Sequence, residues 1–471
     1  MVALLLARPP YRGMVDCPQP ARIIETLGGD FYDPVAPADF PQAVLRYRND
    51  RAAAELGLDR IDDEAWVQRF ARFEPFEGSL PCPLALRYHG HQFRSYNPDI
   101  GDGRGFLYAQ FRAADGRLMD LATKGSGQTP WSRFGDGRLT LKGGVREILA
   151  TEMLEALGVE TSRTLSLIET GEELHRGDEP SPTRSAVLVR LSHGHIRIGT
   201  FQRLAYSRDV HGLKALAGYV LANLFEKQGD DPVRLLELVV ARTARLAGSY
   251  MAAGFVHGVL NSDNINVTGE SFDYGPWRFA PAFDPGFTAA YFDHTGLYAF
   301  ARQAEAIWWD VAQLASALSL MTDVSALEPV LGRFAALYRA ALVERLFWRL
   351  GIVARDGDAD AVLASRIETA LFESQVPLDR FFFDWRGGRL RRAKQDYAHP
   401  AFTPLAAALE GRATPDALDH PYWSDAEPCA MLIDEVEALW RPIAEQDDWA
   451  PLHAKVAAVR RMGDALARRG A

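Results

Sequence analysis

Apolar and polar residues alternate differently in the two halves of the chain. Two apolar, β-prone runs, 106–112 and 118–125, are separated by an Asp-Gly turn, which predicts a β-hairpin. A second strand pair is predicted at 164–171 and 185–202. Between the two pairs, residues 144–158 have the spacing of a buried helix. This part of the chain therefore combines strands with one long helix.

Helical periodicity dominates after about residue 206, with a long helix predicted at 232–254. Before residue 91, short helices, one of them predicted at 44–58, alternate with Pro-rich connectors. We therefore expect an α+β protein with an N-terminal extension (1–90), a strand-rich small lobe (91–205) and a helical large lobe with a C-terminal extension (206–471).

The amino-acid composition favours a globular protein over one that binds nucleic acid or spans a membrane. With 471 residues, 48% hydrophobic and 24% charged, the chain has the make-up of a globular protein, and its net charge of -10 disfavours a nucleic-acid partner. No apolar run approaches the roughly 18 residues that span a membrane, and the apolar start at 1–13 is interpreted as a buried or docking segment rather than a signal peptide. Cys17, Cys82 and Cys429 have no paired spacing, which fits a reducing compartment. We expect a monomeric protein of the bacterial cytoplasm.

The segment 257–275 has the layout of a kinase catalytic loop and the metal-binding strand that follows it. Val259 stands where the catalytic aspartate of such a loop belongs, whereas Asn264 and Asp273 keep the metal-binding positions. A different carboxylate, Asp263, stands beside Asn264. The pattern indicates a nucleotide and metal site with rearranged chemistry.

Oxygen ligands suit a hard cation, so Asn264 and Asp273 are predicted to bind Mg²⁺ or Mn²⁺ together with phosphates and water. Asp263 is then placed to accept a proton from an incoming hydroxyl. His257 is interpreted as a structural hydrogen-bonding residue, and Asp284 as a turn former.

The parts follow one another in the order of a protein-kinase-like, two-lobed fold. Lys124 ends the second hairpin strand, where a phosphate-binding lysine is expected, and Glu147 on the following helix is expected to orient it. Arg190 and Arg197 flank the turn 192–195, and antiparallel strands joined by that turn would bring both guanidiniums to one phosphate. Further positive charge in this region comes from Arg104, Arg133, Arg138 and Lys142. The basic run 386–394 is interpreted as solvated surface, with a docking patch as the alternative.

Several longer motifs resemble the SelO (selenoprotein O) family, whose members have a kinase-like fold. The resemblance implies protein adenylylation, in which ATP binds in a flipped orientation, AMP passes to a Ser, Thr or Tyr hydroxyl of a protein, and pyrophosphate leaves. The motifs that carry it are KGSGQTPWSRFGDGR (124–138), LKGGVREILATEMLEALGV (141–159), AVLVRLSHGHIRIGTFQ (186–202), GFVHGVLNSDNINVTGESFDYGP (254–276), GHQF (90–93) and IGDGR (100–104).

The same resemblance implies a role for individual residues. Asp263 corresponds to the proton acceptor, and Asn264 and Asp273 to the metal ligands. The implied nucleotide-binding positions are Gly101, Gly103, Arg104, Lys124, Asp136, Gly137, Arg190, Arg197 and Asp273.

Two alternative functions remain open at this point. One is a kinase-like phosphotransferase that uses Asp263 as its base; the other is a non-catalytic ATP-binding scaffold, favoured by Val259. The chain also departs from the family in two places. Only Cys429 lies in the C-terminal half, where some members carry a redox-active pair, and the turn 192–195 contains two histidines.

Overall fold

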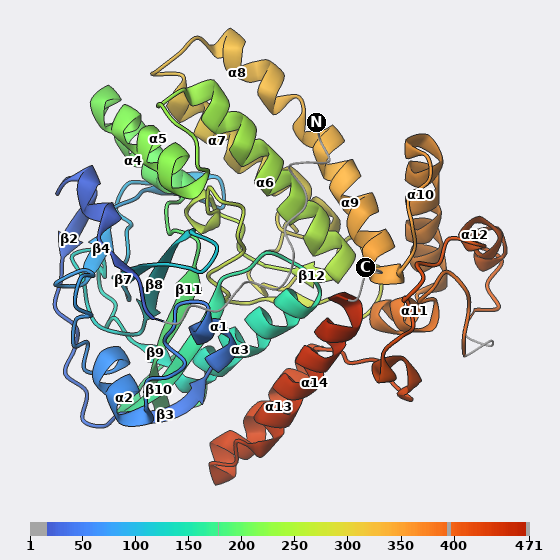
Figure 1. The fold of residues 1–471 in the computed structure, drawn as a ribbon, viewed down its shortest axis with the longest axis horizontal. Coiled ribbons are helices and arrows are strands. Elements are labelled where there is room, and N and C mark those ends of the chain that lie inside the picture. The colour runs from blue at the N-terminus through green and yellow to red at the C-terminus, as the bar shows by residue number, and fades with distance from the viewer. Residues whose placement is uncertain (1–16, 178, 393–396, 468–471) are drawn as a thin grey trace.

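A computed structural model describes residues 17–177, 179–392 and 397–467 (Figure 1). The apolar start at 1–13, predicted as a buried or docking segment, lies outside the described residues. Within them, the chain is a mixed α+β protein, and no helix is both long enough and apolar enough to cross a membrane. Cys17, Cys82 and Cys429, all described, are free thiols.

One antiparallel sheet organises the N-terminal half. In the described part of the chain it contains nine strands, in the order β2-β4-β7-β8-β11-β10-β3, with β1 paired to β7 and β9 to β11. Four of these strands come from the first 90 residues. The strands are β1 (Pro20–Ala21), β2 (Tyr32–Pro34), β3 (Val44–Arg48), β4 (Leu84–Leu86), β7 (Leu107–Arg112), β8 (Leu118–Lys124), β9 (Leu139–Thr140), β10 (Arg163–Leu174) and β11 (Thr183–Ser192).

Both faces of this sheet are covered, which explains the continuous apolar run in β11. Val187 and Val189 face a cluster that includes Trp66 of α2 (Asp63–Phe70). Leu188 faces the opposite cluster, with Val145 of α3 (Leu141–Ala156). A strand buried on both sides needs no polar alternation. The short helix α1 (Asp50–Ala54) lies on the α2 side.

Helices make up most of the chain after β11, and α6 lies among them, packed against α7, α8 and α9 (Figure 1). Asp231 caps α6 at its start and Gly254, at φ +72°, ends it. The helices are α4 (Ile198–Tyr206), α5 (Val210–Leu224), α6 (Pro232–Ala253), α7 (Gln303–Leu318), α8 (Val324–Leu331), α9 (Phe334–Leu350), α10 (Gly357–Ser374), α11 (Leu378–Asp384), α12 (Phe402–Leu409), α13 (Ile433–Gln446) and α14 (Ala450–Ala467).

Short elements connect these parts. In the described residues there are two small two-stranded sheets and four 3₁₀ turns. The sheets are β5 (Gly90–Gln92) with β6 (Ser95–Asn97), a hairpin, and β12 (Phe255–Val256) with β13 (Arg278–Phe279). The turns are η2 (Ile23–Leu27), η3 (Ser262–Asn264), η4 (Phe300–Arg302) and η5 (Pro421–Ser424). The last two helices, α13 and α14, return to pack against α3 (Figure 1). These two helices therefore contact the helix that covers the sheet.

Most predicted elements are confirmed, including the hairpin of β7 and β8, the helix α3 and the long helix α6. Two were wrong. The helix predicted at 44–58 begins as the strand β3, because these β-prone residues pair with β10 at the sheet edge. The strand predicted to run to 202 ends at Ser192, and α4 follows.

The basic run 386–394 was wrongly interpreted as solvated surface. Arg386 is only 1% exposed, and its guanidinium donates to the carbonyl oxygens of Ala417 (2.9 Å) and Trp348 (2.7 Å). Arg391 donates to the carbonyl oxygen of Trp423 at 2.8 Å. These arginines bind backbone acceptors between helices, which a count of charges along the sequence does not reveal. Residues 393 and 394 of the run lie outside the described residues.

Candidate active site

A cleft of about 570 Å³ opens beside β7 and β8, between the loop 100–105 and the turn η3. This volume is within the range of small-molecule sites. Ten of the twelve residues predicted for the site line it; the other two, Glu147 and Asn264, adjoin lining residues. The ten are Gly101, Gly103, Arg104, Lys124, Asp136, Gly137, Arg190, Arg197, Asp263 and Asp273.

The two-residue period of β-strands explains why the side chains of Lys124 and Arg190 lie on the same face of the sheet. Lys124 on β8 pairs with Leu188 on β11, and Ala122 pairs with Arg190, so both cations lie on one face of the sheet. On that face α3 places Glu147 against Lys124, and the ammonium and carboxylate form a buried ion pair. The expected Lys–Glu pair is therefore present in the structure.

Asp273 is the point on which three cations converge. Its carboxylate lies 2.8 Å from Lys124 Nζ, 3.4 Å from Arg190 Nη1 and 3.6 Å from Arg197 Nη1. Burial acts to raise the pKa of Asp273, but these cations outweigh burial and hold it well below its usual range. Its φ of +66° is unusual for a residue with a side chain. The surrounding contacts thus fix an ionised carboxylate at this point.

Arg197 reaches the cleft by a different route from the one predicted. It is the residue immediately before α4, not part of a second strand. Its guanidinium donates to the carbonyl oxygen of Asp263 (2.9 Å) and to Asp102 Oδ1 (3.1 Å), and it lies over the ring of Tyr88. Arg190 and Arg197 each have a buried Nε with no hydrogen-bond partner in the described structure. Both guanidiniums nevertheless meet at Asp273.

Asp263 lies in η3, only 7% exposed, and the hairpin β5–β6 packs directly on it. A Cβ on Gly90 would stand 2.8 Å from the Asp263 Cβ, so this approach requires a glycine. Burial raises the pKa of Asp263 to about 6, partly opposed by Arg197 and by a hydrogen bond from Gln92. Its Oδ1 has no hydrogen-bond partner among the described residues. The carboxylate is therefore weakly solvated, and its free oxygen can accept a proton.

Asn264 Nδ2 donates to the carbonyl oxygen of Val259 at 3.1 Å, which assigns the amide nitrogen to the loop. Its Oδ1 and the Asp273 carboxylate provide hard oxygen atoms, which fit Mg²⁺ or Mn²⁺. In the described part of the chain, no three His, Cys, Asp or Glu side chains gather as a metal cage. A cation held by two protein oxygens needs further ligands, and phosphates and water would provide them.

His257 and Asp284, which were predicted to have structural roles, make the contacts expected for such roles. His257 is buried, and its Nε2 lies 2.9 Å from the carbonyl oxygen of Phe272. Asp284 accepts a hydrogen bond from Gly286 N at 2.9 Å, as a turn former does. Neither residue lines the cleft.

Several residues of the cleft were missed from the sequence. A Cβ on Gly101 would stand 2.5 Å from the Trp131 ring, so this glycine is needed for packing of the loop on Trp131. The position of Asp102 between two glycines was an available signal for its role as a partner of Arg197. The missed lining residues with polar or aromatic side chains include Tyr88, Gln92, Asp102, Trp131 and His195.

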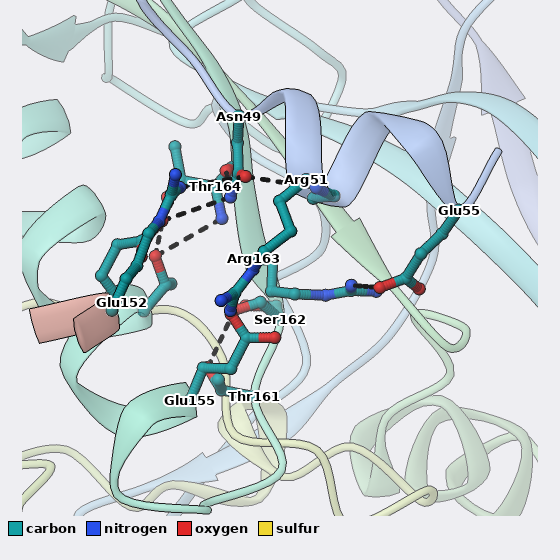
Figure 2. A network of polar contacts seen from close by, with 12 residues as sticks. Asn49, Arg51, Glu55, Glu152, Glu155, Thr161, Ser162, Arg163 and Thr164 are labelled. Carbon is teal, nitrogen blue, oxygen red and sulfur yellow. Dashed lines mark hydrogen bonds and ion pairs between the residues drawn. The ribbon is translucent and has the colours of Figure 1, made fainter. Parts of the chain in front are cut away.

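A second buried polar cluster lies further along α3, and we call it the Glu152 brace: Tyr47, Asn49, Glu152 and Arg460. Arg460 of α14 contacts Glu152 Oε1 at 2.6 Å and Oε2 at 2.8 Å. The same guanidinium donates to Asn49 Oδ1 at 3.0 Å, and Tyr47 Oη donates to Glu152 Oε1 at 2.6 Å. Figure 2 shows Asn49 and Glu152 in this network. The brace ties the N-terminal segment, α3 and α14 together.

The fold and the cleft define a class of protein. A buried Lys–Glu pair, a glycine-containing loop and an Asp263–Asn264 turn facing Asp273 are the parts of a nucleotide-dependent transferase site. The profile of the family described as protein adenylyltransferase SelO matches residues 19–405, and the chain belongs to this family.

Relatives agree with this assignment. The chain is 43% identical to the protein nucleotidyltransferase YdiU of Synechococcus elongatus, with 94% of this chain and 95% of that protein covered. It is 44% identical to the protein of the same name from Gloeobacter violaceus (93% and 94% covered) and 38% identical to that of Azotobacter vinelandii (79% and 77% covered). The resemblance noted from the motifs and the enzyme class that it implied, protein nucleotidyltransferase, are confirmed.

Proposed function

We propose that this chain transfers AMP from ATP to Ser, Thr or Tyr hydroxyls of proteins and releases pyrophosphate. The observation that carries the proposal is the convergence of Lys124, Arg190 and Arg197 on Asp273, in a cleft that also contains Asp263. Among the described residues, seven Lys and Arg residues line the cleft against four Asp residues, which leaves positive charge for a polyphosphate. The family's adenylyltransferase description supports the same reaction.

The position of the cations supports a flipped nucleotide. Lys124 and Arg190 are buried on the sheet face beneath α3, so the outer phosphates would point inward, toward these side chains. The α-phosphorus then faces Asp263. Gly101, Gly103 and Arg104 border the cleft on one side, and Asp136 and Gly137 on another.

The same orientation suits a kinase-like, two-lobed arrangement. In it, the sheet and α3 (within 91–205) form the small lobe, the helices of 206–471 form the large lobe, and residues 1–90 extend the sheet.

The chemistry follows from the residues of the cleft. The acceptor oxygen attacks the α-phosphorus, the bond from that phosphorus to the α–β bridging oxygen breaks, and the hydroxyl proton passes to Asp263. Lys124, Arg190 and Arg197 stabilise the negative charge that develops on pyrophosphate. Asn264 and Asp273 would hold Mg²⁺ or Mn²⁺, and a cation there would neutralise phosphate charge.

Two samples of ATP, labelled at the α- or at the γ-phosphate, test the proposal. With a bacterial protein extract as acceptor, label should enter protein from the α position only. Protein label from the γ position only would refute the proposal and support a phosphotransferase that uses Asp263. Label from neither position, with ATP bound, would support a non-catalytic scaffold. Lys124→Ala should weaken ATP binding and transfer together, because it removes a phosphate contact and unpairs Glu147.

A further inference from the structure

The turn between β11 and α4 contains two buried histidines with contrasting surroundings. His193 has both ring nitrogens against carbonyl oxygens, Nδ1 at 2.8 Å from Leu118 O and Nε2 at 2.9 Å from Leu224 O. His195, only 2% exposed, has Nδ1 at 3.4 Å from Asp120 Oδ2 and a buried Nε2 with no partner among the described residues. His193 is therefore part of the packing, whereas His195 has an unused ring nitrogen.

His195 also lines the nucleotide cleft, together with Arg190 and Arg197. Asp120 lies on β8, four residues before Lys124, so the period of two puts both on the same sheet face. Gln110 Nε2 donates to Asp120 Oδ1 at 2.7 Å, which holds the carboxylate behind the imidazole. The arrangement has a carboxylate on one ring nitrogen and the cleft-lining cations beside the ring.

We propose that His195 binds a phosphate oxygen of the nucleotide: as the phosphates enter, Nε2 takes up a proton from water and donates a hydrogen bond to them. The proposal rests on the proposed function, because it requires a polyphosphate in this cleft. It assigns the turn histidine to the binding of the outer phosphates.

The proton balance follows from the groups that face the ring. With Asp120 ionised, Nδ1 carries the hydrogen and donates to that carboxylate, so Nε2 of the neutral ring is an acceptor and cannot bind phosphate. Burial lowers the pKa of His195, Arg190 and Arg197 lower it further, and Asp120 opposes them. Incoming phosphates reverse the sign of the local charge and favour the imidazolium. Binding then consumes one proton from solvent, and affinity rises as the pH falls through the pKa of the bound state.

Calorimetric titration with a Mg²⁺ complex of α,β-methylene-ATP, which cannot transfer AMP, tests this proton uptake. Titrations in buffers of different ionisation enthalpy give the protons taken up per nucleotide. Wild type should take up about 0.5 to 1 more proton than His195→Gln. Between pH 8.5 and 6.5, an uptake of that size corresponds to a rise in affinity of roughly 10- to 100-fold relative to that variant. Titration of the nucleotide itself is common to both proteins and cancels in the difference.

His211→Gln is the matched control, because His211 is exposed on α5 and does not line the cleft. It should behave as wild type. Equal proton uptake by wild type and His195→Gln, with normal binding, would overturn the histidine assignment and leave the proposed function intact. Absence of binding to wild type would overturn both. If His195→Gln does not fold, ¹⁵N-histidine spectra of wild type decide: nucleotide must convert one buried histidine signal from neutral to imidazolium, and an unchanged spectrum refutes the proposal.

Discussion

Helix α3 carries two buried glutamates whose surroundings differ. Glu147 pairs with Lys124, which also contacts Asp273, and there two arginines crowd the same carboxylate. Glu152 pairs with Arg460 alone among the cations, and the neutral groups of Tyr47 and Asn49 complete its hydrogen bonds within the described structure. Glu147 thus belongs to a network in which three cations share Asp273, whereas Glu152 belongs to a matched pair.

The difference predicts that the charges around Asp273 contact a ligand and that the charges around Glu152 stabilise the fold. A buried ion pair with all its hydrogen bonds made is strongly destabilised when one partner is removed. Cations that share one carboxylate repel one another, so removing one of them relieves repulsion as well as breaking a contact. Substitutions in the cleft should therefore reduce activity with little loss of stability, and substitutions in the Glu152 brace should do the opposite.

The largest effect is expected for Asp263→Asn in the cleft. The exchange keeps the shape of the side chain but removes the proton acceptor, so AMP transfer should fall by about 10²- to 10⁴-fold. Binding of ATP should change little, and stability should be unchanged or higher, because a buried carboxylate with an unpartnered oxygen is removed. Transfer of α-label, nucleotide titration and thermal unfolding measure the three quantities.

Asp284→Asn serves as the control for that exchange, since this carboxylate forms a turn away from the cleft. It should retain transfer. Loss of ATP binding in Asp263→Asn equal to its loss of transfer would place Asp263 among the nucleotide contacts and contradict its assignment as the base.

Arg190→Met comes next in size and tests the surplus of cations. Loss of a charge-assisted phosphate contact costs about 1.5–3 kcal/mol, which weakens ATP binding roughly 10- to 150-fold. The unfolding temperature should stay within about 2 °C of wild type, because Asp273 keeps Lys124 and Arg197. A large drop in stability with unchanged ATP affinity would show that the cleft cations serve the fold.

Arg460→Met should give the reverse pattern. It leaves Glu152, only 4% exposed, without its cation, so the free energy of unfolding should fall by about 2–3 kcal/mol. The ATP dissociation constant should change less than threefold, since Arg460 lies outside the cleft. Arg461→Met is the matched control, because the ion pair of Arg461 with Asp425 is exposed; its guanidinium also lies 5.7 Å from the centroid of the Tyr422 ring, and the exchange should cost less than about 1 kcal/mol. Denaturant unfolding and nucleotide titration measure both quantities.

The sequence was most informative where contacts are local. The hairpin of β7 and β8 follows from alternation and an Asp-Gly turn, and the order of Lys124 and Glu147 indicated their pairing. The catalytic-loop motif likewise placed Asp263 and Asn264 together, because neighbours in one turn share a site whatever the rest of the chain does.

Long-range contacts account for what the sequence did not reveal. The strand β3 is fixed by pairing with β10, more than 100 residues away, and this pairing overrides the local helical pattern. The hairpin β5–β6 reaches Asp263 across about 170 residues, so the local hydrophobic pattern around Gln92 does not indicate its contact with the cleft. Arg197 was assigned to a strand because the apolar run continues past it, although α4 begins there.

The smallest effect is expected in a double-mutant cycle on Glu152 and Arg460, which measures the coupling energy between the two charges of the Glu152 brace. Glu152→Gln alone leaves Arg460 without its anion, and Arg460→Met alone leaves Glu152 charged and buried. The double variant removes both charges, so its loss of stability should be smaller than the sum of the single losses by about 1 kcal/mol or more. Arg190 and Arg197 repel each other, and removing either one already relieves that repulsion. The same cycle on this pair should therefore give a double loss of stability larger than the sum of the single losses, which is a coupling of opposite sign. Additive losses in both cycles would contradict the division of the α3 glutamates into a structural and a ligand-binding region.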